Sequence, residues 1–165
     1  MRYERFEQLA AWQGSIDLAV QVYAMTGKPV FRRWHSLRDQ IERAAVSVSN
    51  NIAEGFERGT NQELLTFLYI SRSSAGEVRS MLSLLERIPA FRDLESEILN
   101  LKSRAESISR QLGAWTRSLK ESDLKGQRFV TEKTRRASEA RRQREEFLEK
   151  LAQIRKGGPP AAEKP

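Results

Sequence analysis

The feature that most constrains the fold of this chain is a regular apolar repeat between residues 94 and 119. Its apolar side chains recur at alternating steps of four and three residues, at Leu94, Ile98, Leu101, Ala105, Ile108, Leu112, Trp115 and Leu119. A mean spacing of 3.5 residues places them along one side of an α-helix and favours slightly supercoiled antiparallel packing. The repeat therefore predicts a long helix that is covered by other helices.

Three earlier segments show the same helical period. The first expected stripe is Phe6, Leu9, Gln13, Ile16, Val20 and Tyr23, widened by Trp12 and Ala19. The second is Leu37, Ile41, Ala44, Ala45, Val48, Ile52 and Phe56, and the third is Leu64, Phe67, Leu68, Ser71, Ala75, Val78, Leu82 and Leu85. A further row lies beside the third stripe, at Ile70, Ser74, Met81, Leu84 and Ile88. Because one bundle cannot bury so wide an apolar surface, we expect a homo-oligomer.

Turn and capping signals separate the segments. Pro29 prevents the first helix from resuming. Ser36 with Asp39, and Thr60 with Glu63, resemble capping boxes at the starts of the second and third helices. The predicted fold class is all-α, an antiparallel up-down-up-down four-helix bundle with a charged, partly helical C-terminal extension. We place the bundle at residues 1–122, the basic extension at 123–156 and a disordered tail at 157–165.

Positive charge is concentrated after the fourth helix. The chain has 165 residues and a formal net charge of +7. Residues 1–119 hold 16 Lys/Arg against 14 Asp/Glu, whereas residues 120–165 hold 13 against 8. The cluster between residues 133 and 144 contributes six cations, Lys133, Arg135, Arg136, Arg141, Arg142 and Arg144. A basic end on a near-neutral body is typical of nucleic-acid binding, and the alternative is a solvated charged tail.

Arginines on the expected bundle form two further groups. Arg32, Arg33 and Arg38 surround the first connection, and Arg72 and Arg79 lie two turns apart on one flank of the third helix. That spacing suits contacts along a phosphate backbone. The alternative is that these side chains solubilise the surface or pair with acids.

Motifs for catalysis are nearly absent from the sequence. There is no GxxxxGK[ST], GxGxxG or GxSxG pattern, no cysteine, and a single histidine, His35. We therefore expect no enzymatic activity, no cofactor and no metal site. The N-terminus lacks a signal-peptide core, and no apolar run approaches the roughly 20 residues that span a bilayer. These features predict a cytoplasmic protein.

The stretch NNIAEGFERG, residues 50–59, does not resemble an ordinary helix surface. A catalytic site, a phosphate-binding turn and a packing motif are the possible interpretations. At 100° per residue, a polar row lies beside the apolar stripe of the second helix, formed by Gln40, Ser47, Asn51, Glu54 and Arg58. Gly55 falls at the core edge, where a missing side chain lets another helix approach closely. Since buried amides and charges need partners, the row indicates packing against a helix or another subunit.

The residues resemble a family of four-helix proteins encoded within intervening sequences of large-subunit ribosomal RNA genes. The resemblance covers residues 3 to about 119. In the first helix it rests on Phe6, Leu9, Trp12, Ala19 and Tyr23. In the second it rests on Leu37-x-x-Gln40-x-x-Arg43-Ala44-Ala45-Val46-Ser47-Val48, Asn51-Ile52-Ala53-Glu54-Gly55 and Arg58. In the third it rests on Glu63, Phe67, Leu68, Ser74 and Glu77.

This resemblance implies a ring-like homopentamer without enzymatic activity. It also implies kinship with the accessory variability determinants of diversity-generating retroelements, which bind a reverse transcriptase together with RNA or DNA. The basic extension after Leu119 departs from the shorter members of the family. Our first hypothesis is therefore a non-enzymatic, oligomeric nucleic-acid-binding accessory protein, with a reverse transcriptase as a candidate partner. The alternative is a homo-oligomeric protein–protein scaffold with no nucleic-acid role.

Overall fold

The computed structural model describes residues 4–121, 144, 147 and 148. Its long helices are α1 (Ala10–Thr26), α2 (His35–Glu57), α3 (Asn61–Leu85) and α4 (Glu95–Glu121). Short 3-10 turns precede or join them, η1 (Phe6–Gln8), η2 (Pro29–Arg33) and η3 (Pro89–Leu94). The described part of the chain contains no β-strand, so the all-α class is confirmed.

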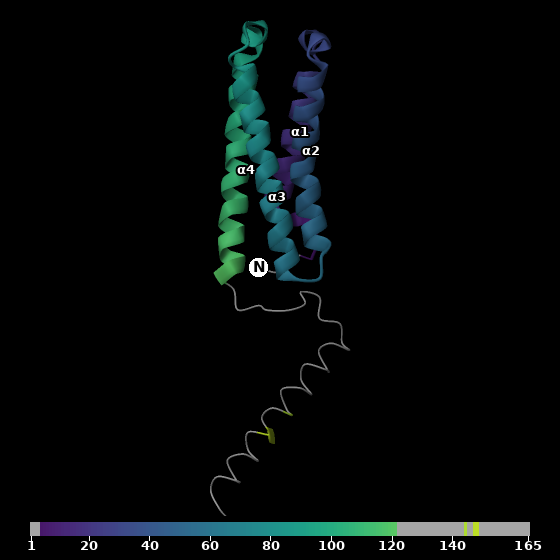
Figure 1. Cartoon of the computed structure of the whole chain (residues 1–165), viewed down its shortest axis with the longest axis vertical. Coiled ribbons are helices and arrows are strands. Elements are labelled where there is room, and N and C mark those ends of the chain that lie inside the picture. The colour runs from purple at the N-terminus through teal and green to yellow at the C-terminus, as the bar shows by residue number, and fades with distance from the viewer. Residues whose placement is uncertain (1–3, 122–143, 145–146, 149–165) are drawn as a thin grey trace, which may run out of the picture. The chain divides into compact units, whose positions relative to one another are not determined.

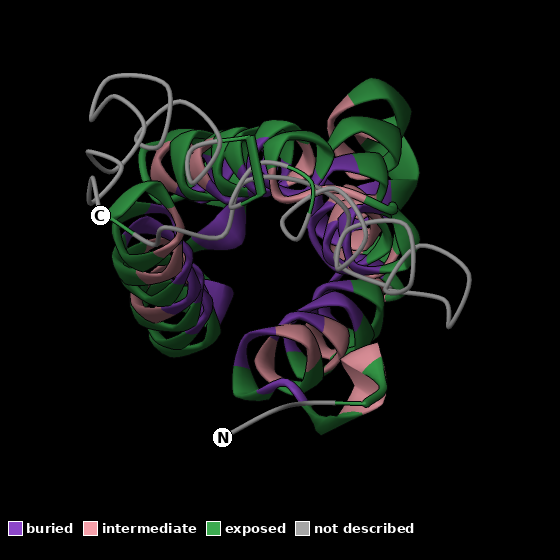
Figure 2. Cartoon of the chain, turned by 90° about the horizontal axis from the view of Figure 1, so that it is seen from below, coloured by how far each residue is buried: buried purple, intermediate pink, exposed green. Residues whose placement is uncertain are grey.

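The four helices lie side by side and share one interior (Figure 1). The principal contacts join α1 to α2, α2 to α3, α3 to α4 and α1 to α4, so every helix has two neighbours. η2 and η3 lie at one end of the helices, and the link between α2 and α3 lies at the other (Figure 1). Seen along the axis, the buried residues face the middle of this arrangement (Figure 2).

The chain divides into two compact units, Met1–Gln127 and Arg128–Pro165. All four helices belong to the first unit. The predicted boundaries after residues 122 and 156 lie outside the described residues. Among the helices that the structure describes, none combines the length and the apolar composition needed to cross a membrane.

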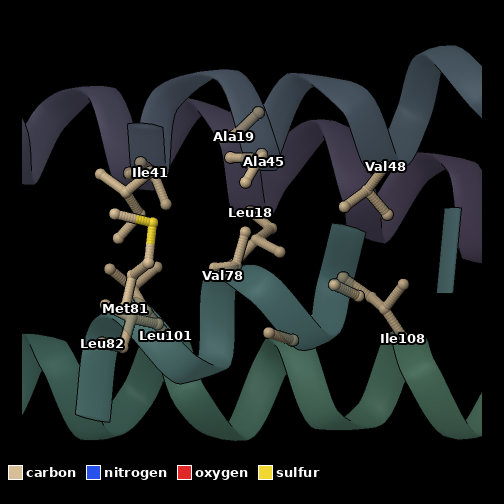
Figure 3. Close-up of a cluster of buried hydrophobic side chains, with 14 of the residues drawn as sticks. Leu18, Ala19, Ile41, Ala45, Val48, Val78, Met81, Leu82, Leu101 and Ile108 are labelled. Atoms are coloured by element: carbon tan, nitrogen blue, oxygen red, sulfur yellow. The ribbon is translucent and has the colours of Figure 1, made fainter. Parts of the chain in front are cut away.

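The core is made of aliphatic side chains contributed by all four helices. Figure 3 shows Leu18 of α1, Ile41 of α2, Leu82 of α3 and Leu101 of α4 within one buried cluster. Each of these side chains is almost fully buried, which removes it from water and stabilises the folded state by about 1.5–3 kcal/mol. The predicted apolar stripe of α4 is confirmed, since its central members from Ile98 to Leu112 are all buried.

The predicted stripe of the first helix is confirmed at Leu9 and Ala19, which are buried, and is wrong further along α1. Val20 and Tyr23 were expected inside, but they are 62% and 50% exposed. The buried face is instead Ala11, Ser15, Leu18, Ala19, Val22, Met25 and Thr26. The reason is that Asp17 is the only charged residue of α1, so apolar side chains occur all round this helix and two stripes compete.

Of the two predicted helix caps, the one at Thr60 is present as an N-cap. The Thr60 hydroxyl accepts a hydrogen bond from the Glu63 backbone N–H at 3.2 Å and caps α3. The box expected at Ser36 is wrong, because α2 begins at His35 and no side chain caps it.

Aromatic packing fixes the entry into α2 instead of a side-chain cap. The Phe31 and Phe91 rings lie 4.8 Å apart, and Trp34 lies 5.7 Å from Phe91. These contacts join η2 to η3, so they also hold two helix connections together at one end of the four helices.

We predict that Phe91→Ala destabilises the protein by about 3–5 kcal/mol, because it removes a fully buried ring that η2 and Trp34 pack against. Urea denaturation followed by circular dichroism measures the change in unfolding free energy. Leu99→Ala is the control, since Leu99 is 47% exposed on α4 and its loss costs less than about 0.5 kcal/mol. Equal losses from the two variants would contradict the role assigned to the ring.

Candidate functional site

The central part of the polar row on α2 is bonded to its own helix and to α3. The Asn51 amide donates to the Ser47 carbonyl oxygen at 2.7 Å and lies 2.9 Å from the Ser47 hydroxyl. The Ser47 hydroxyl in turn lies 2.9 Å from the hydroxyl of Ser74 on α3. Ser47 and Asn51 are both half-buried. A neighbouring helix of the same chain therefore supplies the partner for this part of the row.

The ends of the row are exposed. The Arg58 guanidinium pairs with the Glu54 carboxylate, four residues earlier on the helix surface, at 2.5 Å. It also lies over the Phe67 ring, 4.9 Å from its centroid, which adds a cation–π contact to α3. Gln40, at the other end of the row, is exposed. The structure thus brings Ser47 and Arg58 against α3, holds Asn51 on Ser47 of its own helix and leaves Gln40 apart from them.

Gly55 lies at a close approach between α2 and α3. A Cβ atom at this position would lie 2.7 Å from the Phe67 Cβ and 3.2 Å from the Leu64 Cδ1. Distances below 3.0 Å require one of the atoms to move, and here the nearest atom is a Cβ close to the α3 backbone. The close approach of another helix that the sequence predicted at Gly55 is present, and the approaching helix is α3.

Two hydroxyls that complete this contact were not identified as polar partners from the sequence. The Ser71 hydroxyl donates to the Val48 carbonyl oxygen at 2.8 Å, which joins α3 directly to the α2 backbone. Ser74 contacts Ser47 as described above. Both serines stand among apolar residues of the third helix, which predicted that they are buried. A small hydroxyl residue at a buried position could have indicated a hydrogen bond to a neighbouring helix.

The hydroxyl and amide groups around NNIAEGFERG are therefore used in contacts between helices. No buried polar side-chain atom of the described residues lacks a hydrogen-bond partner. The geometry supports the packing interpretation of this stretch, and it offers no paired nucleophile and base.

The first arginine group lies on and after η2. Arg32 and Arg33 are exposed on this turn, which the buried Phe31 anchors. Arg38 is different, because its guanidinium lies 3.2 Å from the Asp39 carboxylate and 3.8 Å from that of Glu42. The structure thus pairs Arg38 with acids of its own helix, as the alternative interpretation of this group allowed.

One member of the second arginine group, Arg72, lies where α3 meets α4. The Arg72 guanidinium lies against Gly113 of α4, and a Cβ there would be 3.4 Å from the Arg72 Cζ. Arg79 is exposed two turns further along α3. Within the described residues, no carboxylate oxygen lies within 4.0 Å of either guanidinium.

The basic cluster of the extension is described at one residue. Arg144 is helical and exposed. The other predicted members, Lys133, Arg135, Arg136, Arg141 and Arg142, lie outside the described residues.

Acid and metal chemistry has little support in the described part of the chain. No group of three His, Cys, Asp or Glu side chains there is placed to hold a metal ion. His35 is exposed in the first turn of α2. A backbone hydrogen bond and the Arg5 guanidinium, 3.1 Å away, hold the pKa of Glu7 below its usual value, so this carboxyl stays ionised. That is the opposite of what a general acid needs.

A pocket between α1 and α4 has a volume of about 230 Å³. It is lined by Gln21, Ala24, Ser96, Glu97, Asn100 and Leu101. This is smaller than the roughly 300–1,000 Å³ of common ligand sites. It also opens to solvent, and it contains none of the predicted site residues.

These observations define the class of the protein as an all-α protein of four long helices, in which serine hydroxyls and the close contact at Gly55 join α2 to α3. Residues 7–114 match the model of the family described as 23S rRNA-intervening sequence protein, and the chain belongs to this family. A comparison with curated proteins found no match.

We predict that Gly55→Ala lowers the unfolding free energy by about 1–3 kcal/mol, because the new methyl group forces α2 and α3 apart. Gly76→Ala is the matched control. Gly76 is also inside a helix, but nothing lies within 4 Å of a Cβ there, so helix propensity stabilises this variant by about 0.5–1 kcal/mol. Thermal melts of the two variants measure the difference. A stabilised Gly55→Ala variant would show that the helices do not need this contact.

Proposed function

We propose that this protein is a non-enzymatic, oligomeric nucleic-acid-binding accessory protein. In this proposal the four helices form an antiparallel up-down-up-down bundle. Five copies of the chain assemble into a homopentamer in the cytoplasm. The observation that carries the proposal is an excess of cations without acidic partners. The net charge is +7, and Arg72 and Arg79 have no carboxylate within 4.0 Å among the described residues. Unpaired guanidinium groups on a folded surface favour binding to a polyanion.

Membership of a family named for intervening sequences of 23S rRNA genes is consistent with a role close to nucleic acid. Beyond it, the resemblance to accessory variability determinants of diversity-generating retroelements supports a reverse transcriptase as the protein partner. The partner complex would contain RNA or DNA together with this chain. The neighbouring genes test this part of the proposal, since a retroelement requires an adjacent reverse transcriptase gene and a template repeat.

A protein–protein scaffold is the second candidate, and exposed apolar side chains favour it. Val20 and Tyr23 on α1, and Ile70 and Leu84 on α3, are large apolar residues that remain exposed in the single chain. Such residues form contacts between subunits or with another protein when they gather on a surface. This candidate predicts that the protein captures one protein partner even after nuclease treatment.

We predict that the full chain binds structured RNA in a filter-binding assay at low salt, and that its affinity falls steeply as salt rises. The physical reason is the release of counterions when Lys and Arg neutralise phosphates. A chain ending at residue 121 keeps all four helices and loses the cluster at 133–144, so its affinity and its salt dependence are both reduced. An absence of binding by the full chain at low salt would contradict the nucleic-acid proposal.

We also predict a homo-oligomer in solution. Light scattering at micromolar concentration should give a mass of five times 19.0 kDa, which is about 95 kDa. Val20→Lys together with Ile70→Lys introduces charge on exposed apolar positions and should lower this mass without unfolding the chain. A monomeric mass for the unmodified protein would contradict both the proposed pentamer and the homo-oligomeric scaffold.

A further inference from the structure

One half of the α3–α4 pair contains cations and no acids. Residues 64–76 of α3 and residues 107–120 of α4 include no Asp or Glu. The same two stretches contain Arg72, Arg110, Arg117 and Lys120. Elsewhere on these helices acids and bases alternate, as in the Lys102–Glu86 pair near the other end. Positive charge is therefore concentrated on one part of this helix pair.

Two contacts bring the cations of this region to the line along which α3 meets α4. The Lys120 ammonium lies 5.3 Å from the centroid of the Tyr69 ring. The Arg72 guanidinium lies against Gly113, where the missing side chain leaves room for it. We call this surface the basic seam. It is made of Tyr69 and Arg72 of α3 with Gly113 and Lys120 of α4, and the exposed Arg79, two turns from Arg72 on α3, continues it beyond the acid-free stretch.

Within the described residues, the cations of the basic seam form no ion pair with an acid. Arg72, Arg79 and Lys120 have no carboxylate oxygen within 4.0 Å among the described residues. Arg110 differs from them, because it pairs with Glu106 of its own helix at 2.9 Å. Tyr69 is 42% exposed, so part of its side chain is accessible on the surface where Lys120 lies over its ring.

We propose that the basic seam binds single-stranded nucleic acid, with phosphates at the three cations and a base stacked on Tyr69. This inference rests on the proposed function and assigns its site and ligand class. Arg72 and Arg79 lie two turns apart, about 10.5 Å along the axis of α3, so they meet successive parts of one backbone. A narrow line of cations ending at an exposed aromatic ring is the arrangement that binds single strands without sequence preference.

Gly113 is a positioning residue in this site. Its buried backbone lets the Arg72 guanidinium lie across α4, 3.4 Å from where a Cβ would stand. A large side chain at this position displaces the guanidinium from the line that joins Lys120 to Arg79. The site therefore depends on a residue of α4 that does not itself touch the ligand.

The test uses the full chain and a fluorescently labelled oligouridylate of about 12 nucleotides, with affinity measured by anisotropy over a range of salt concentrations. Arg72→Gln together with Arg79→Gln should weaken binding at least tenfold at low salt. The double variant should also reduce the slope of log affinity against log salt by about 1.4, at about 0.7 per phosphate contact on a single strand. Tyr69→Leu should weaken binding about tenfold and leave the slope unchanged, because it removes stacking and no charge.

Arg104→Gln together with Arg110→Gln is the matched control. It also removes two positive charges, but from guanidinium groups that are bonded within α4, Arg104 to Asn100 and Arg110 to Glu106. Thermal melts verify that every variant is folded. A duplex of the same length tests the ligand class, and the proposal expects the single strand to bind more tightly.

The outcomes distinguish failure of the basic-seam proposal from failure of the proposed nucleic-acid-binding function. Weaker binding in the seam variants, with the control close to the unmodified chain, supports the basic seam. Equal losses in the seam and control variants, or tighter binding of the duplex, overturn the seam and leave nucleic-acid binding standing. No binding of any RNA by the unmodified chain overturns both.

Discussion

The structure depends most on the short distance between α2 and α3 at Gly55. A Cβ there would lie only 2.7 Å from the Phe67 Cβ, so the spacing of the two helices leaves no room for a side chain at this position. The same distance lets the Ser71 hydroxyl reach the Val48 carbonyl oxygen of the other helix at 2.8 Å. Buried hydroxyls without partners cost about 1–3 kcal/mol each, so a wider spacing would lose packing and hydrogen bonding together. Gly55 and the serines Ser47, Ser71 and Ser74 thus position α3 against α2, and α4 packs on α3.

The four helices and the core face of α4 were predictable because charged residues mark the outer side of that helix. Ile98, Leu101 and Ala105 repeat at steps of three and four between acids and bases, so only one register is compatible with burial. α1 lacks this information. It has one charge, and the apolar residues Val20 and Tyr23 were as good a stripe as the buried one. Periodicity identifies a helix from its own residues, but small residues such as Ser15 reveal their face only once the neighbouring helices are in place.

The candidate site shows the same limit at the level of single contacts. Gly55 was identified from its position on the helix, because a glycine at a core edge has a local geometric meaning. Pairing of Arg38 with acids was one of the alternatives that the sequence allowed. It could be foreseen because Asp39 and Glu42 are only one and four residues away on the same helix. The contacts of Arg72 with Gly113 and of Lys120 with Tyr69 were not predictable, because they depend on how far α3 and α4 are shifted along each other. No single-helix pattern specifies that shift.

The uneven distribution of charge between helices has a kinetic consequence. α1 carries Asp17 and no Lys or Arg, whereas the stretch of α4 from residue 107 to 120 carries cations alone. A long polyanion near the folded unit therefore exerts a torque on it as well as an attraction, since its field pulls the surface of α4 more strongly than that of α1. The molecule would be turned toward the polyanion before contact, and fewer collisions would be lost to wrong orientations. Association would then be faster at low ionic strength even where the final contacts are few.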